Sequence, residues 1–107
     1  GIDKFATNLL PVMDSLEKAM EHAQKEEGPM KDGLLAIYRQ LVHAMEVSGM
    51  KSFEPVGEKF DPNRHQAVTV VPPAEGQESG TVATVFQKGW MIQERVLRPA
   101  MVAVAQG

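Results

Sequence analysis

Residues Phe60–Val68 read FDPNRHQAV, and the interpretation of this stretch decides the fold. Asp61 before Pro62 favours a turn, and Asn63 continues it. We expect the Asp61 carboxylate to accept backbone amides of the turn. We expect His65 to donate a ring proton to a carbonyl and so fix the loop on the strand that follows. An acid, a base and an amide in one short loop also resemble an active site, so this alternative has to be weighed.

Downstream of this loop the chain is typical of short strands. β-branched and aromatic residues, bounded by proline and glycine, predict strands over Gln66–Val71, Thr81–Gln87, Trp90–Ile92, Arg95–Leu97 and Met101–Ala105. Gln93 and Glu94 would form a two-residue hairpin turn, although this pair is poor turn chemistry. Strands this short and this close in sequence favour a small antiparallel sheet.

Upstream of the loop the chain predicts two helices. Apolar residues recur at three- and four-residue steps in the first helix, which is interrupted by Pro11, where we expect a kink or a restart. Residues 26–29 (Glu-Glu-Gly-Pro) predict a break, the second helix should run over Met30–Ser48, and Gly49 suits a left-handed cap. The apolar faces consist mainly of Phe5, Leu9, Val12, Met13, Leu16, Met20 and Ala23, then Leu34, Leu35, Ile37, Tyr38, Leu41, Val42 and Met45.

The apolar face of the second helix is too wide for a single partner helix to cover. A bundle of more than two helices is therefore expected, and a dimer would supply four. The predicted fold class is α+β, with a helical dimerisation segment at residues 1–49 and a small β-domain at residues 50–107. Gly33 lies near the start of the second helix, where it costs about 1 kcal/mol relative to alanine. It marks either a fraying helix end or a close approach by a partner.

Composition excludes several classes of protein. The chain has 107 residues, no cysteine and a formal net charge of −3. The lack of cysteine rules out disulfides and thiolate metal sites. Because the net charge is negative, non-specific electrostatic binding to nucleic acid is not expected. The apolar runs are too short for a membrane span, and no secretory signal pattern opens the chain, so we expect a cytoplasmic protein. The abrupt start at Gly1, without a clear helix cap, suggests either an artificial boundary of the chain or a longer helix that has been truncated.

A search for catalytic or metal-binding patterns finds none. His22, His43 and His65 lack the spacing of helical metal ligands. Gly76–Gly80 has the wrong spacing for a nucleophile elbow, and neither a phosphate-binding loop nor a dinucleotide fingerprint occurs. We therefore predict no enzyme activity, no catalytic residue, no metal and no cofactor, and we favour scaffolding as the role of FDPNRHQAV.

Two stretches together resemble a known family. FDPNRHQAV, followed after a variable loop by Gly89–Val104 (GWMIQERVLRPAMVAV), resembles the carboxyl-terminal signature of the GrpE family. Leu9–Leu16 (LLPVMDSL) resembles the helical segment that follows this family's long stalk. Trp90 departs from the usual Tyr or Phe, Pro99 from a small residue, and the long amino-terminal stalk helix is missing.

The resemblance implies a nucleotide exchange factor. GrpE proteins are homodimers whose short helices form a four-helix bundle and whose β-domains act as wings. One wing binds the nucleotide-binding domain of a DnaK-type chaperone and holds its cleft open, so that ADP leaves; the factor itself does not bind nucleotide. The stalk, which points towards the chaperone's substrate-binding part, is linked to temperature response.

The resemblance also assigns residues. It makes Arg95 and Gly33 candidate chaperone contacts. Phe86 and Val104 are possible apolar contacts in the same wing, although each could equally lie in the core and Val104 fits a core position better. The structural signature comprises Phe60, Asp61, Pro62, His65, Ala67, Gly89 and Trp90, of which Trp90 is expected in the core. The bundle would be built from Leu9, Met13, Leu16, Met20, Leu34, Tyr38, Leu41 and Met45.

Three alternatives remain at this point. The chain is either an exchange factor or a dimerisation and docking module without exchange activity of its own. A small hydrolase that uses His65 and Asp61 is the third and weakest reading.

Overall fold

The computed structural model describes residues 2–23 and 28–107 and divides the chain into two compact units. The first, Gly1–Met50, is here called the helical unit, and the second, Lys51–Gly107, the sheet unit. The predicted break at residues 26–29 falls partly on residues 24–27, which lie outside the described residues. Helices followed by small sheets confirm the predicted α+β class.

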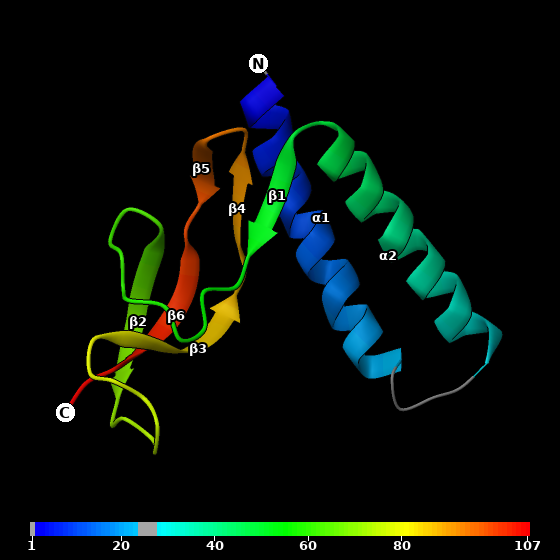
Figure 1. Ribbon diagram of the computed structural model, residues 1–107. Coiled ribbons are helices and arrows are strands. Elements are labelled where there is room, and N and C mark those ends of the chain that lie inside the picture. Colours follow the sequence, from blue (N-terminus) through cyan, green and yellow to red (C-terminus); the bar gives the residue numbers. More distant parts are fainter. Residues whose placement is uncertain (1, 24–27) are drawn as a thin grey trace. The chain divides into compact units, whose positions relative to one another are not determined.

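The helical unit is a pair of helices that pack on one another (Figure 1). They are α1, Ile2–Ala23, and α2, Pro29–Val47, so α2 is displaced by one residue from its predicted bounds. Gly49 follows α2 with φ of 89°, and its N–H donates to the Glu46 carbonyl at 3.0 Å, which confirms the expected left-handed cap. Among the described helices, none combines the length and the apolarity needed to cross a bilayer.

Pro11 lies inside α1, and the predicted restart of the helix there is wrong. A proline within a helix removes one backbone hydrogen bond but keeps a helical φ. Leu10 and Met13 beside it are 1% and 0% exposed. Because most helical stability comes from packing an apolar face, this burial offsets the lost hydrogen bond.

The sheet unit contains two three-stranded sheets, ordered β1-β4-β5 and β2-β6-β3. The strands are β1 Met50–Phe53, β2 His65–Val71, β3 Thr81–Gln87, β4 Gly89–Ile92, β5 Arg95–Arg98 and β6 Ala100–Ala105. Five of them begin and end within one residue of the predicted strands. β1 was not predicted, because its sequence MKSF is short and carries little strand signal.

Strand pairing differs in one respect from the expected antiparallel sheet. β6 is antiparallel to β3 but parallel to β2, with His65 opposite Ala100 and Val71 opposite Ala105 (Figure 1). Parallel strands need a long connection, and here β3, β4 and β5 lie in the chain between β2 and β6. β4 and β5 form the predicted hairpin, and Gln93 in its turn has φ of 53°.

The core of the sheet unit lies around β6. Because β6 is the central strand, five of its six residues are buried, and its sequence AMVAVA is nearly all apolar, as expected of a strand covered on both faces. The core cluster consists of Val82, Ala100, Val102 and Val104, with Phe53, Phe60 and Val85 packed against it.

Candidate functional site

The stretch FDPNRHQAV forms a tight turn that leads into β2. The Asp61 carbonyl accepts the N–H groups of Arg64 at 3.0 Å and His65 at 2.8 Å. The Asp61 carboxylate accepts the Asn63 N–H at 2.9 Å, as expected from an aspartate at the start of a turn. Pro62 lies exposed within the turn, and Ala67 is paired with Val102 in β2. Asp61 is thus engaged in holding the turn.

The His65 ring accepts a hydrogen bond from this turn, whereas the prediction was that it donates one. Its Nδ1 accepts the Asp61 N–H at 2.9 Å, so the prediction that the ring donates to a carbonyl is wrong. An Nδ1 that accepts must be unprotonated, because a neutral imidazole has one donor and one acceptor nitrogen. The side chain is 4% exposed. Burial first, and then the neighbouring Arg64 charge, hold the pKa of His65 below its ordinary value.

The His65 geometry does not suit the hydrolase reading. Nδ1 already accepts a backbone amide, and Nε2 is buried. A general base has to reach a substrate proton within hydrogen-bond distance. Neither ring nitrogen has access to one. Among the described residues, no group of three His, Asp or Glu side chains is placed to hold a metal ion.

A cluster that we call the joint connects the two sheets; it consists of Phe53, Phe60, Arg64, His65 and Gly89. The Phe53 ring centroid lies 6.4 Å and the Phe60 centroid 5.8 Å from that of His65. The Arg64 guanidinium lies 4.8 Å from the Phe53 centroid, within the range of a cation–π contact. Gly89 lies so close to Phe53 that a Cβ on Gly89 would collide with the ring. Phe53 ends β1 and His65 begins β2, so the joint spans both sheets.

Sequence reasoning missed Phe53 and Arg64. Phe53 lies in the unpredicted strand β1, and its contacts are remote in sequence. Arg64 is part of FDPNRHQAV but resembles any exposed turn residue when the fold is unknown. The only available signal was its position beside the histidine.

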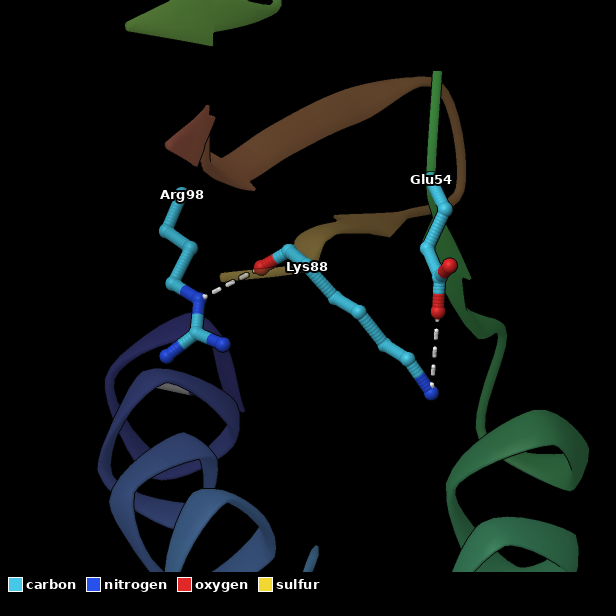
Figure 2. A network of polar contacts seen from close by, with 3 residues as sticks. All are labelled: Glu54, Lys88 and Arg98. Carbon is cyan, nitrogen blue, oxygen red and sulfur yellow. Dashed lines mark hydrogen bonds and ion pairs between the residues drawn. The ribbon is translucent and has the colours of Figure 1, made fainter. Parts of the chain in front are cut away.

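A polar network fixes the chain where β3 passes into β4 (Figure 2). Arg98 at the end of β5 donates from Nε to the Lys88 carbonyl at 3.0 Å. The Lys88 ammonium reaches the Glu54 carboxylate at 3.4 Å. The Lys88–Glu54 ion pair is partly exposed, so it contributes little to stability by itself. Its effect is to hold Lys88, and hence Gly89 after it, in a defined position.

The four candidate contact residues lie on four different elements. Arg95 is exposed at the start of β5, two residues after the strained Gln93. Phe86 is 58% exposed and lies at a register shift of β3, in the other sheet. Gly33 is exposed on α2, in the helical unit, with no atom within 4 Å of the place a Cβ would take. Val104 is 8% exposed and part of the core, because both faces of the central strand β6 are covered; a direct contact with a partner is therefore not supported.

The remaining predicted residues are placed as follows. Trp90 is 3% exposed, and Phe60 is half-buried against the core of the sheet unit. In the helices, Met13 and Met45 are buried. The other bundle residues, Leu9, Leu16, Met20, Leu34, Tyr38 and Leu41, are half-buried.

Comparison with known proteins assigns the chain to a family. The GrpE family model matches residues 1–106. Protein GrpE of Paraburkholderia phymatum is 50% identical over 105 residues, covering 98% of this chain and 51% of that protein. Protein GrpE of Burkholderia cenocepacia is 51% identical over 106 residues, covering 99% of this chain and 58% of the relative. This chain thus spans about half the length of the curated relatives it matches, and it belongs to the GrpE family.

Proposed function

We propose that this chain is the dimerising and chaperone-docking part of a nucleotide exchange factor. It binds the nucleotide-binding domain of a DnaK-type chaperone, stabilises the open cleft and speeds the release of ADP in the cytoplasm. The observation that carries the proposal is the family match over residues 1–106, which includes both signature stretches. The acceleration of ADP release from a loaded chaperone tests it, and binding without acceleration would favour the module that docks but does not exchange.

Exchange of this kind requires no contact with the nucleotide. A protein that binds the open cleft more tightly than the closed one shifts the equilibrium by its difference in affinity. A shift from 1:99 to 99:1 needs about 5.5 kcal/mol of that difference. By linkage, if the exchange factor lowers the chaperone's affinity for nucleotide, bound nucleotide lowers the chaperone's affinity for the exchange factor to the same extent. Tight binding of ATP therefore releases the exchange factor. The residues that matter are therefore docking contacts, not catalytic groups.

Three exposed residues are proposed as docking contacts. Arg95 offers a fork of donors suited to a carboxylate on the chaperone. The positive φ of Gln93, two residues before it, is a backbone strain of the kind that concentrates at functional sites. Phe86 offers an exposed aromatic side chain, and arginine and aromatic residues dominate the energetics of interfaces. Gly33 offers a flat helix surface that a partner can approach closely.

The exposed apolar side chains of the helices support a homodimer. Phe5 and Val12 on α1 are 64% and 54% exposed, and Met30 and Ile37 on α2 are 75% and 56% exposed. Apolar surface on two neighbouring helices is characteristic of an interaction site. We propose that a second copy covers it and completes a four-helix bundle.

Replacing Ile37 with glutamate should dissociate this dimer. The carboxylate would be buried at the interface without a partner, which costs about 1–3 kcal/mol or more. We expect dimer dissociation to become at least about tenfold easier, because each 1.4 kcal/mol is a factor of ten. Analytical ultracentrifugation over a concentration series measures this. Gln40→Glu, at an exposed polar position of the same helix, is the matched control. A monomeric wild-type chain, or an unchanged dimer in Ile37→Glu, would contradict the proposed bundle.

Replacing Gly33 with glutamine should weaken docking without harming the fold. The site has open space and no positive φ, so the side chain fits, and the helix should gain about 0.5 kcal/mol from its better propensity. We expect an unchanged or higher Tm together with weaker chaperone binding by titration calorimetry. Gly33→Ala, which adds only a methyl group, is the control for backbone effects. Wild-type affinity in Gly33→Gln would remove Gly33 from the docking surface.

A further inference from the structure

His65 is the only titratable side chain among the described residues that is buried, and it lies at the centre of the joint. Its ring is flanked by Phe53 from β1 and by Phe60 from the turn. On the neighbouring strand β6 it lies opposite Ala100, whose N–H donates to the Arg64 carbonyl at 3.0 Å. The groups that contact the ring are therefore mostly apolar.

The hydrogen bond at Nδ1 requires a neutral ring. Asp61 N–H donates to Nδ1 at 2.9 Å, so a proton on Nδ1 would set two donors against each other. The other nitrogen, Nε2, is buried and has no hydrogen-bond partner among the described residues. Protonation would thus break the hydrogen bond at Nδ1 and leave a buried charge without a hydrogen-bond acceptor at Nε2 among the described residues.

Three charged groups act on the ring. The Arg64 guanidinium, adjacent in the chain, opposes protonation, whereas the Asp61 and Glu58 carboxylates favour it. Phe53, Phe60 and Ala100, from the other segments around the ring, carry no charge. Burial and the Arg64 charge together outweigh the two carboxylates, so the pKa of His65 lies below its ordinary value of 6.5.

We propose that His65 is an acid-sensitive latch, whose protonation releases the Asp61–His65 turn and loosens the joint between the two sheets. The released state binds a proton more readily than the closed one, because its His65 titrates near 6.5. The stabilisation by the latch is complete above that pH and is lost as the pH falls through the lower pKa of the closed state. The free energy of unfolding of the sheet unit should therefore decrease in mild acid, at a pH above the range in which most carboxylates become protonated.

The test follows the sheet unit alone and needs no chaperone. Trp90 is the only tryptophan and is buried in β4, directly after Gly89 of the joint. Urea unfolding is followed by Trp90 fluorescence at pH values from about 8 down to about 5. In the wild-type chain, the urea concentration at the midpoint of unfolding should decrease as the pH is lowered. In His65→Asn, the side-chain oxygen can still accept the Asp61 N–H but does not titrate, so the midpoint should depend much less on pH. His43→Asn, at an exposed position of α2, should behave like wild type.

Two results would overturn the latch. One is a pH dependence in His65→Asn equal to that of the wild type. The other comes from the wild-type chain alone, so it holds even if the variant does not fold. In a proton–nitrogen NMR titration, the His65 ring and the Asp61 amide should titrate together with one midpoint below 6.5. A His65 ring that becomes protonated while the Asp61 amide signal stays unchanged would show that the turn is not released.

Discussion

Replacing Gly89 with alanine is expected to destabilise the sheet unit by about 1–3 kcal/mol, the usual cost of overpacking a well-filled site. The added Cβ would collide with the Phe53 ring. The Arg64 guanidinium and the His65 ring both lie close to the Phe53 ring, so a displacement of that ring would disturb the joint. Gly89 is thus required by a close approach, not by its backbone angle, since its φ is not positive. Urea unfolding monitored by Trp90 fluorescence measures the loss.

Two further variants make this prediction specific. Phe53→Leu removes the outer ring atoms that the new methyl group would strike. The loss in the free energy of unfolding of the double variant Gly89→Ala/Phe53→Leu should therefore be smaller than the sum of the losses in the two single variants. Gly33→Ala makes the same change where no atom lies within 4 Å, and it should raise the stability of the helices by up to about 1 kcal/mol. A neutral effect of Gly89→Ala, or strict additivity in the double variant, would refute the described contact.

Replacing Arg95 with alanine is expected to weaken chaperone docking by about 30-fold or more. Arginines that anchor an interface typically cost at least about 2 kcal/mol when truncated. Arg95 is exposed at the start of β5, so the free energy of unfolding should change by no more than about 0.5 kcal/mol. Surface plasmon resonance against the isolated nucleotide-binding domain of the chaperone measures the affinity.

Two controls separate a specific contact from a general charge effect. Arg95→Lys keeps the charge but loses the planar fork of donors, so it should recover only part of the affinity if the partner is a carboxylate. Lys51→Ala removes one exposed positive charge elsewhere in the sheet unit and should leave affinity nearly unchanged. Equal losses of affinity in Arg95→Ala and Lys51→Ala would indicate that net charge, and not a specific contact, determines binding. An unchanged affinity in both variants would exclude Arg95 as an anchor.

Local patterns were sufficient for most of the secondary structure. β-branched residues between proline and glycine marked the strands, and Thr81–Gln87 matched β3 at both ends. Apolar spacing marked both helices, and the glycine at residue 49 marked the end of α2. These features depend on residues within a few positions of each other, so a single sequence contains them.

Pairing and packing between distant residues were not predictable in this way. The parallel pair β2–β6 joins strands whose order in space depends on the whole sheet unit. A restart of the helix at Pro11 was among the expectations, because the burial of Leu10 and Met13 near it cannot be read from local propensity. Val104 is buried, as its preferred assignment to the core predicts, and the central position of β6 gives the reason.

The candidate site was predictable in outline only. The turn at Asp61 followed from its residues, and its carboxylate accepts a backbone amide as expected. The direction of the His65 hydrogen bond did not follow, because an imidazole nitrogen can donate or accept and only its neighbours decide which. The contact roles of Arg95 and Gly33 rest on family resemblance and that of Phe86 on its apolar side chain, and all three stay predictions.

The rate of ADP release is the most direct test of the proposed function. A DnaK-type chaperone loaded with fluorescent ADP is mixed with excess unlabelled ATP and increasing amounts of this chain, and the release rate is followed by stopped flow. We expect release to accelerate and then saturate as the chain concentration rises, with Arg95→Ala shifting the curve to higher concentration. A release rate that stays at its basal value, at concentrations where binding to the chaperone is complete, would contradict the proposed exchange activity.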